Sequence, residues 1–239
     1  MTTKNPWDSL SQYFDTNKED LEAGSADNIL IAWPVILQFI REYTRENKDL
    51  RLLEFGCGTG GFANKLQVMG FNVTGIDSSS KMIEVAKKAH GNSIDFKIGD
   101  STIVPRLGKF DVITSVMALQ FIENIDETIK DLSQSLNPRG IFVFAVFNPN
   151  YVVDGIKSKK VFMDFDSDTK PTKGITEFSS EIRVSTFIRT ASEYNQLARK
   201  YGFKPLLEKY PPFPQEFLAK YRQNIPTNHS EYLILGYKR

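Results

Sequence analysis

Three glycines at alternate positions follow a short apolar stretch, and they are the most informative feature of the sequence. Residues 52–61 read Leu-Leu-Glu-Phe-Gly-Cys-Gly-Thr-Gly-Gly. A turn without Cβ atoms lets the backbone approach a ligand closely. The helix that follows directs its first N–H groups at the same place. The pattern therefore indicates a site for a nucleotide-containing cofactor.

The spacing of the glycines leaves two classes of cofactor open. Gly56, Gly58 and Gly61 also satisfy the Gly-x-Gly-x-x-Gly pattern of dinucleotide sites. Asp77 lies about 20 residues further on, where an acid would hold a ribose hydroxyl. Both a nicotinamide dinucleotide and a nucleoside sulfonium compound fit these residues.

Further residues favour the sulfonium compound. A carboxylate at Glu54, just before the turn, would repel a pyrophosphate but would suit the ammonium group of an amino acid. Asp100 ends a predicted strand and can accept a hydrogen bond from an adenine amino group, while the backbone N–H of Ser101 can reach a ring nitrogen. In addition, about 50 residues precede the first predicted strand, whereas simple dinucleotide domains often begin with it.

The elements that must position these residues alternate along the chain. Strands and helices in alternation indicate βαβ units and a parallel sheet. Asp77 and the two serines after it also supply N-cap residues for the second helix. The expected strands cover residues 51–55, 72–76, 94–98, 110–115 and 140–147, and the expected helices between them cover 60–69, 79–90 and 124–136.

The two flanking regions follow other patterns. Helices are expected at 6–14 and 26–46, and Pro34 predicts that the second is kinked or divided in two. Residues 148–151, Asn-Pro-Asn-Tyr, are interpreted as a turn that ends the fifth strand. Beyond them we expect antiparallel strands at Val161–Phe165 and Ile175–Arg189, a helix near 191–201, a strand at 203–209, a helix at 215–222 and a last strand at Tyr232–Tyr237.

Four motifs in order identify a family resemblance. They are Leu-Glu-Phe-Gly-Cys-Gly-Thr-Gly, Val-Thr-Gly-Ile-Asp-Ser-Ser-Ser-Lys-Met, Ile-Gly-Asp-Ser and Phe-Asp-Val-Ile-Thr-Ser-Val-Met-Ala-Leu-Gln-Phe-Ile. With these motifs, residues 50–147 resemble the class I S-adenosylmethionine-dependent methyltransferases. The strands expected at 203–209 and 232–237 are similar to the closing hairpin of that family.

The resemblance implies a fold. We expect an α/β, Rossmann-like three-layer sandwich with a seven-stranded, mostly parallel sheet and an antiparallel last strand, plus N-terminal helices and a small antiparallel β insertion. Residues 1–239 would form a single domain. Its parts would be a helical cap (1–48), a cofactor-binding core (49–150), an antiparallel insertion or lid (151–190) and a C-terminal helix with closing strands (191–239).

The resemblance also implies roles for particular residues. The backbone at the first two glycines, with Glu54 nearby, would hold the methionine part of the cofactor, and Asp77 would bind both ribose hydroxyls. Met82 would flank the adenine, Asp100 and Ser101 would bind the adenine edge, and the backbone at Ser115 would close over the amino group. The full expected cofactor set is Glu54, Gly56, Cys57, Gly58, Gly60, Asp77, Ser78, Met82, Asp100, Ser101 and Ser115.

The acceptor side is less specified by the sequence. Gln120 stands where many small-molecule members of the family carry a histidine, so no catalytic residue is assigned. The candidates for a base or orienting group are Gln120, Glu123 and His229, and the candidates for contact with the acceptor are Tyr13, Trp33, Phe121 and Tyr151. The alternatives are a solvated loop position for His229 and aromatic side chains that merely cover the sheet edge. Cys57 is interpreted as a small packed side chain.

The function expected from the resemblance is transfer of a methyl group from S-adenosylmethionine to a small-molecule acceptor. S-adenosylhomocysteine would be the product, and no metal would take part. The reaction would be an in-line displacement, catalysed mainly by positioning. Other hypotheses are an RNA or protein methyltransferase, which a basic stripe including Lys157, Lys159 and Lys160 would favour, a cofactor-binding protein without transferase activity and, least favoured, a nicotinamide oxidoreductase.

Composition limits the classes of partner. The chain has 30 basic and 29 acidic residues, so no strong net field attracts nucleic acid or a membrane. The longest apolar stretches are too short to span a bilayer, and no signal peptide is found at the start of the sequence. A single cysteine fits a reducing compartment. We therefore expect a cytoplasmic monomer or homodimer that acts on a small molecule, without nucleic acid or membrane partners.

Overall fold

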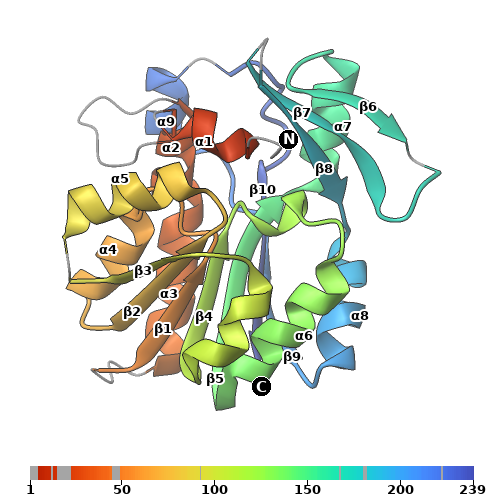
Figure 1. The fold of residues 1–239 in the computed structure, drawn as a ribbon. Helices are drawn as coiled ribbons and strands as arrows, with labels where there is room; N and C mark the ends of the chain where they lie inside the picture. Colours follow the sequence, from red (N-terminus) through yellow and green to blue (C-terminus); the bar gives the residue numbers. More distant parts are fainter. Residues whose placement is uncertain are drawn as a thin grey trace.

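A seven-stranded sheet forms the centre of the structure, a computed structural model that describes residues 5–11, 13–14, 23–44, 49–91, 93–166, 168–179, 182–221 and 223–239 (Figure 1). The strand order is β3-β2-β1-β4-β5-β10-β9, and β10 alone runs opposite to the other six strands. The expected Rossmann-like sheet with an antiparallel last strand is confirmed. The strands are β1 (Arg51–Phe55), β2 (Asn72–Asp77), β3 (Asp95–Ile98), β4 (Phe110–Val116), β5 (Leu136–Phe147), β9 (Lys204–Lys209) and β10 (Tyr232–Lys238).

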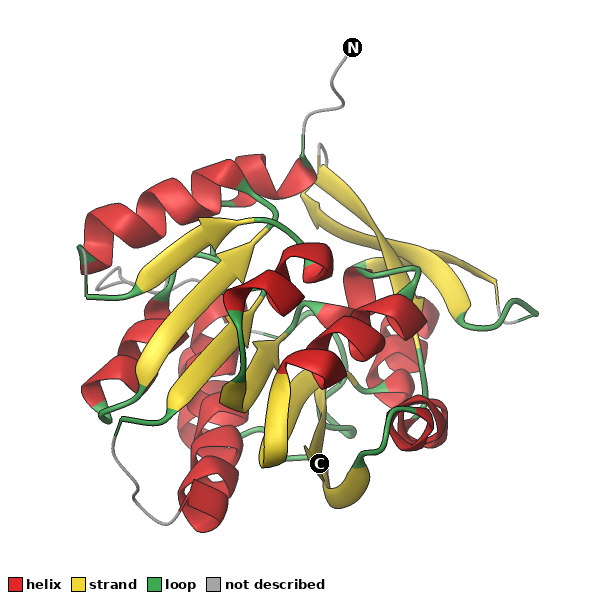
Figure 2. Cartoon of the chain, turned by 60° about the horizontal axis from the view of Figure 1, so that its bottom comes forward, coloured by secondary structure: helices red, strands yellow, loops and turns green. Residues whose placement is uncertain are grey.

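Helices cover both faces of this sheet and produce three layers (Figures 1 and 2). Successive strand residues point to opposite faces, so Leu52 packs with α3, α4 and α5 while Leu53 packs with η2, α6 and α8. The first group is α3 (Trp33–Thr44), α4 (Gly61–Val68) and α5 (Ser80–His90). The second is the 3₁₀ helix η2 (Ser101–Leu107), α6 (Ile125–Ser135) and α8 (Ala191–Lys200).

The helix expected at 26–46 is divided before Pro34 rather than at it. The expected helix 26–46 is two helices, α2 (Ala23–Asp27) and α3, joined by a π-helix, η1 (Asn28–Ala32). Pro34 is the second residue of α3, directly after the π-helix. The expected helix 6–14 is shorter, because α1 spans Pro6–Leu10. Residues 12, 45 and 46 of these two predictions lie outside the described residues.

The region after β5 corrects two predictions. Residues 148–151 begin a helix, α7 (Pro149–Lys157), rather than a simple turn. The Asn148 side chain accepts a hydrogen bond from the Asn150 N–H at 3.1 Å, and Pro149 stands at the first helical position, which proline favours. The single strand expected at Ile175–Arg189 is two antiparallel strands. The insertion is a three-stranded sheet of β6 (Phe162–Asp166), β7 (Thr172–Ser179) and β8 (Ile182–Ile188).

The insertion and the N-terminal helices lie over one edge of the main sheet. Figure 1 shows α1 and the β6–β8 sheet at the top, above the carboxyl ends of the parallel strands. The buried Arg189 fastens the end of the insertion there, donating to the carbonyls of Ile122 and Glu123 at 3.0 and 2.9 Å, just after η3 (Leu119–Phe121). The last short helix is α9 (Gln215–Lys220). Within the described ranges, no helix has the length and apolar character needed to cross a bilayer.

Candidate functional site

A cavity of about 510 Å³ lies at this edge of the sheet. Its volume is in the range of small-molecule sites. One end, here the glycine end, is formed by Gly56, Gly58, Asp77, Ser78, Met82, Gly99 and Asp100. The other, here the acid end, is formed by Asp27, Tyr151, Glu231 and Tyr232. Aromatic side chains cover the space between the two ends.

The glycines of the turn are required for different reasons. All three have positive φ, at +73° for Gly56, +52° for Gly58 and +82° for Gly60. A Cβ at Gly56 would come within 2.4 Å of the Ala118 Cβ, and one at Gly60 within 2.7 Å of the Phe96 ring. A Cβ at Gly58 would meet nothing within 4 Å. Gly56 and Gly60 therefore allow the turn to pack, while Gly58 leaves space beside the cavity.

Asp77 joins this turn to the neighbouring strand. Its carboxylate accepts the Gly58 N–H at 2.9 Å and the Ser79 N–H at 2.8 Å. Burial raises the pKa of Asp77, and these two hydrogen bonds oppose that rise. A carboxylate offers about four acceptor sites, so capacity remains for ribose hydroxyls. The acid is thus held in position before any ligand binds.

Glu54 lies beneath the turn, outside the cavity wall. It is 2% exposed, and its carboxyl group accepts from the Ala63 N–H in the first turn of α4. Oε2 has no hydrogen-bond partner among the described residues. Burial, with the nearby charge of Asp77, raises the pKa of Glu54 well above its ordinary value. Glu54 therefore serves the start of α4, whose N-cap, Gly60, has no side chain to do so.

Three more expected cofactor residues lie behind the cavity wall. Cys57 is buried, and burial raises the pKa of its thiol, which keeps it protonated. The Ser115 hydroxyl is buried without a hydrogen-bond partner among the described residues. Ser101 is buried and donates to Asp131 of α6 at 2.8 Å. In contrast, Asp100 is exposed at the rim and caps η2 by accepting the Thr102 N–H at 3.0 Å.

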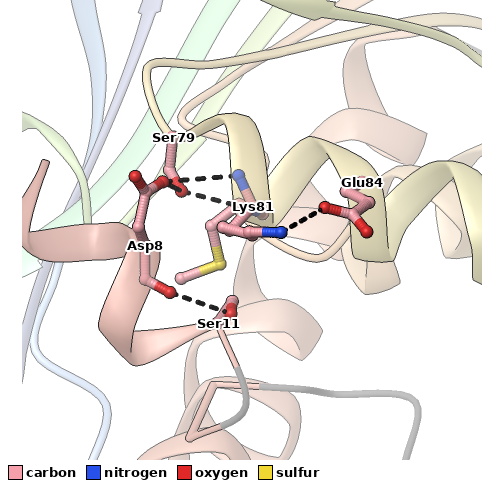
Figure 3. Close-up of polar contacts among 6 residues, drawn as sticks. Asp8, Ser11, Ser79, Lys81 and Glu84 are labelled. Atoms are coloured by element: carbon pink, nitrogen blue, oxygen red, sulfur yellow. Dashed lines mark hydrogen bonds and ion pairs between the residues drawn. The ribbon is translucent and has the colours of Figure 1, made fainter.

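An N-terminal clasp, defined as residues 5–11 with 13 and 14, crosses the glycine end. Figure 3 shows Asp8 beside Ser79 and Lys81 at the start of α5. The Asp8 carboxylate accepts the Ser79 hydroxyl at 2.7 Å and the Lys81 N–H at 3.3 Å. Asn5 donates to the Ser78 carbonyl at 3.0 Å. The clasp is therefore attached to the loop that carries Asp77.

Aromatic rings attach the same clasp to the other wall of the cavity. The Trp7 ring lies 4.6 Å from that of Phe121 and 5.7 Å from that of Phe178 on β7. The Phe14 ring lies 5.3 Å from Phe178 as well. The Thr59 hydroxyl donates to the Phe14 carbonyl at 3.1 Å. The aromatic contacts build a wall along the middle of the cavity.

Two carboxyl groups define the acid end. Asp27 ends α2 and accepts the Asn28 N–H at 2.5 Å, and burial raises its pKa to about 7. Glu231 precedes β10, and burial with the charge of Asp27 raises its pKa well above the ordinary value. Burial and these two charges also raise the pKa of Tyr232. The pair therefore retains a proton near neutral pH.

The candidates for acceptor contact and catalysis divide into two groups. Tyr13, Phe121 and Tyr151 line the cavity. Outside its wall, Trp33 packs on Phe62 with ring centroids 5.0 Å apart, and Gln120 is buried with its amide 3.6 Å from the Met117 sulfur. Glu123 is exposed and pairs with Lys173 at 3.2 Å, while His229 pairs with Asp154 at 2.7 Å in a separate depression.

Several lining residues were not predicted from the sequence. They are Trp7, Asp27, Phe147, Phe178, Glu231 and Tyr232, with others of the wall. Trp7 carried a signal, since it stands in a short amphipathic segment near the chain start. The sequence gives no signal for Asp27 or Glu231, because the residues around them do not distinguish them from surface acids. Across the described stretches, no group of His, Cys, Asp and Glu side chains is arranged to hold a metal ion.

Comparisons with known proteins agree with the geometry. The model of a family described as "Methyltransferase domain" matches residues 17–208. A ubiquinone biosynthesis O-methyltransferase of Pelagibacter ubique is 36% identical over 112 residues, 46% of this chain and 47% of that protein. One from Actinobacillus pleuropneumoniae is 27% identical over 202 residues, 78% and 84% of the two chains. The chain spans about half the length of the first of these relatives.

Solved structures share the fold. An S-adenosylmethionine-dependent methyltransferase from Mesorhizobium loti superposes with a TM-score of 0.65 at 20% identity, covering 91% of this chain and 100% of that one. The PH0226 protein of Pyrococcus horikoshii gives a TM-score of 0.69 at 20% identity and covers 99% of both chains. At these identities the likeness concerns the arrangement of elements.

The glycine turn generates a stability prediction. Gly60→Ala should lower the free energy of unfolding by about 1–3 kcal/mol more than Gly70→Ala, because overpacking adds to backbone strain only at Gly60. Gly70 has a φ of +97°, but a Cβ there would meet nothing within 4 Å. Urea unfolding of both variants measures the difference. Equal losses would show that Phe96 and Ala86 yield without cost.

The acid end generates a pH prediction. Because the folded protein holds protons on Asp27 and Glu231 more tightly than the unfolded chain does, stability should fall as pH rises from about 4 to 7. Asp27→Asn should weaken this dependence and stabilise the protein at pH 8, by an amount on the order of a few kcal/mol. Urea unfolding at pH 5 and pH 8 tests it. A variant with the same slope as the wild-type protein would contradict the prediction.

Proposed function

Because the chain belongs to the family described as a methyltransferase domain, we propose that it transfers a methyl group from S-adenosylmethionine to a small-molecule acceptor. The observation that carries the proposal is the Asp77 carboxylate, fixed between the Gly58 and Ser79 N–H groups at the cavity wall. It is an acceptor prepared for two neighbouring hydroxyls beside a turn that leaves open space at Gly58.

The residues of the glycine end fit the parts of such a cofactor. Asp77 would bind the ribose, Met82 would lie against the adenine, and Asp100 at the rim would accept from its amino group. The backbone at Gly56 and Gly58 would approach the methionine part. When bound, the cofactor supplies an electrophilic methyl group on a sulfonium sulfur.

The remaining wall supports catalysis by positioning. The aromatic side chains Trp7, Phe121 and Phe147 would hold an apolar acceptor and exclude water. Orientation of two reactants in a closed site supplies roughly 7–11 kcal/mol. Of the three candidates for a base or orienting group, none belongs to the described cavity wall. The proposed reaction therefore depends on alignment rather than on any of those side chains.

We propose further that residues 1–239 act as a single domain, as a monomer or homodimer in the cytoplasm, without nucleic acid. Balanced charge supports the last point. The one cysteine, buried as a free thiol, is compatible with a reducing compartment. The acceptor would be a small molecule, as the names of the curated relatives indicate for those proteins.

Titration calorimetry with S-adenosylhomocysteine tests the donor. We expect binding to the wild-type protein, and Asp77→Ala should weaken it by more than about 1 kcal/mol, since a hydrogen bond to a charged group contributes roughly 1.5–3 kcal/mol. Asp95→Ala is the matched control, because this exposed acid at the start of β3 pairs with Lys97 away from the cavity. NAD should not bind measurably. Failure of S-adenosylhomocysteine to bind the wild-type protein would refute the proposal.

A further inference from the structure

The acid end brings together two carboxyl groups from opposite ends of the chain. Asp27 is 7% exposed, and its carboxyl group interacts directly with that of Glu231. Neither forms an ion pair with a described lysine, arginine or histidine. Burying two like charges without a cation is unfavourable. Such a pair is stable in a cavity only with a retained proton or with a positive ligand.

A buried hydroxyl beside this pair also points to a ligand. The Tyr232 side chain is fully buried and lines the cavity, facing Asp27. Its oxygen interacts with the Asp27 carboxyl group, but it forms no hydrogen bond of ordinary geometry with the described residues. Buried hydroxyl groups are normally hydrogen-bonded, and an exception calls for an explanation. A group bound at the acid end would supply the missing partner.

The acid end lies away from the place expected for the cofactor. Glu231 and Tyr232 are at the start of β10, whereas the glycine turn follows β1. Strands β4 and β5 lie between them in the sheet. At about 4.8 Å per strand, the separation is roughly 14 Å. The two carboxyl groups are therefore placed to contact the far end of an acceptor rather than the methionine part of the cofactor.

The charged residues that line the cavity favour an acceptor with a positive charge. The described lining residues include Asp27, Asp77, Asp100, Glu177 and Glu231, and no lysine, arginine or histidine. Glu177 is already paired with Arg183, at 2.8 Å. A phosphate or carboxylate would be repelled at the acid end, where Asp27 and Glu231 lie together. A cation would instead let both Asp27 and Glu231 ionise, since each would gain an opposite charge.

We propose that the acid end binds a protonated nitrogen of the acceptor, so that the acceptor is an amine with an apolar or aromatic body. The body would lie along Phe121, Phe147 and Phe178, which line the cavity between its two ends. Aromatic faces also attract cations. This inference rests on the proposed function, because it identifies the cavity beyond the cofactor as the acceptor site.

Three probes of nearly equal shape test the proposal on the full chain saturated with S-adenosylhomocysteine. Tyramine carries an ammonium group, 4-ethylphenol is neutral, and 4-hydroxyphenylacetate carries a carboxylate. Calorimetry should give tyramine an affinity at least about tenfold higher than that of 4-ethylphenol, and no binding of the carboxylate. Equal affinities, or no tyramine binding, would overturn the proposal while leaving the proposed function intact if S-adenosylhomocysteine still binds.

Variants identify the groups responsible. Asp27→Asn and Glu231→Gln, each close in shape to the native side chain, should each reduce the preference for tyramine at least about fivefold. Glu123→Gln is the control, because this acid is exposed and lies outside the cavity wall. Affinity for S-adenosylhomocysteine should be unchanged in all three, which also reports correct folding. A loss of cofactor affinity with unchanged tyramine preference would assign the pair to the cofactor and overturn the proposal.

Proton release gives an independent readout. The groups that face the pair are Tyr151 of α7 and Tyr232 of β10. An ammonium ion favours the ionised carboxyl groups, so tyramine binding at pH 7 should release a proton to the buffer. Calorimetry in two buffers of different ionisation enthalpy measures this release, which Asp27→Asn should reduce. Proton uptake, or no exchange, would contradict binding of a cation by the pair.

Discussion

The cavity depends on one carboxylate that bridges two strand ends. Asp77 ends β2, yet it accepts the N–H of Gly58 from the turn after β1 and that of Ser79 at the start of α5. The bond to Gly58 is made from a backbone with a positive φ of +52°, a conformation that glycine adopts readily. Turn, acid and helix start are therefore positioned as one unit. Displacement of any of them would disturb the other two.

The charges of the site come from acidic side chains alone among the described lining residues. At the glycine end, Asp77 is stabilised by two backbone N–H groups, whose dipoles carry only partial charge and leave most of its negative charge in place. The acid end holds two carboxyl groups whose pKa values are raised by burial. With no basic side chain among the described lining residues, the cavity has a negative potential when these acids ionise. Such a field favours a sulfonium donor over its neutral product.

The parts of the fold that could be predicted from the sequence are those set by local pattern. The strand–turn–helix around Gly56 and the alternation up to β5 depend on residues close in the chain. The start of α7 was missed because Asn148 and Pro149 suit a turn and a helix N-terminus equally well. Trp33, a predicted acceptor contact, follows the π-helix Asn28–Ala32 and lies outside the described cavity wall. An extra residue in a turn rotates the helix that follows, and here Trp33 lies against Phe62.

The acid end could not have been predicted by any local rule. Asp27 and Glu231 lie near opposite ends of the sequence, and only the pairing of β10 with β5 brings the second acid to the cavity. Neither belongs to a periodic pattern, and a single acid in a polar segment is ordinarily a surface residue. Their pairing is a property of topology, which a single sequence does not display.

The N-terminal clasp has a kinetic consequence. Asp8 holds it to the loop that follows Asp77, while Trp7 and Phe14 hold it to the insertion sheet through Phe178. A short segment fixed at both walls cannot leave one without loosening its hold on the other. A molecule that enters or leaves past the clasp would therefore have to break contacts at both walls, so its rate of exchange would depend on residues 5–11, 13 and 14 rather than on the sheet.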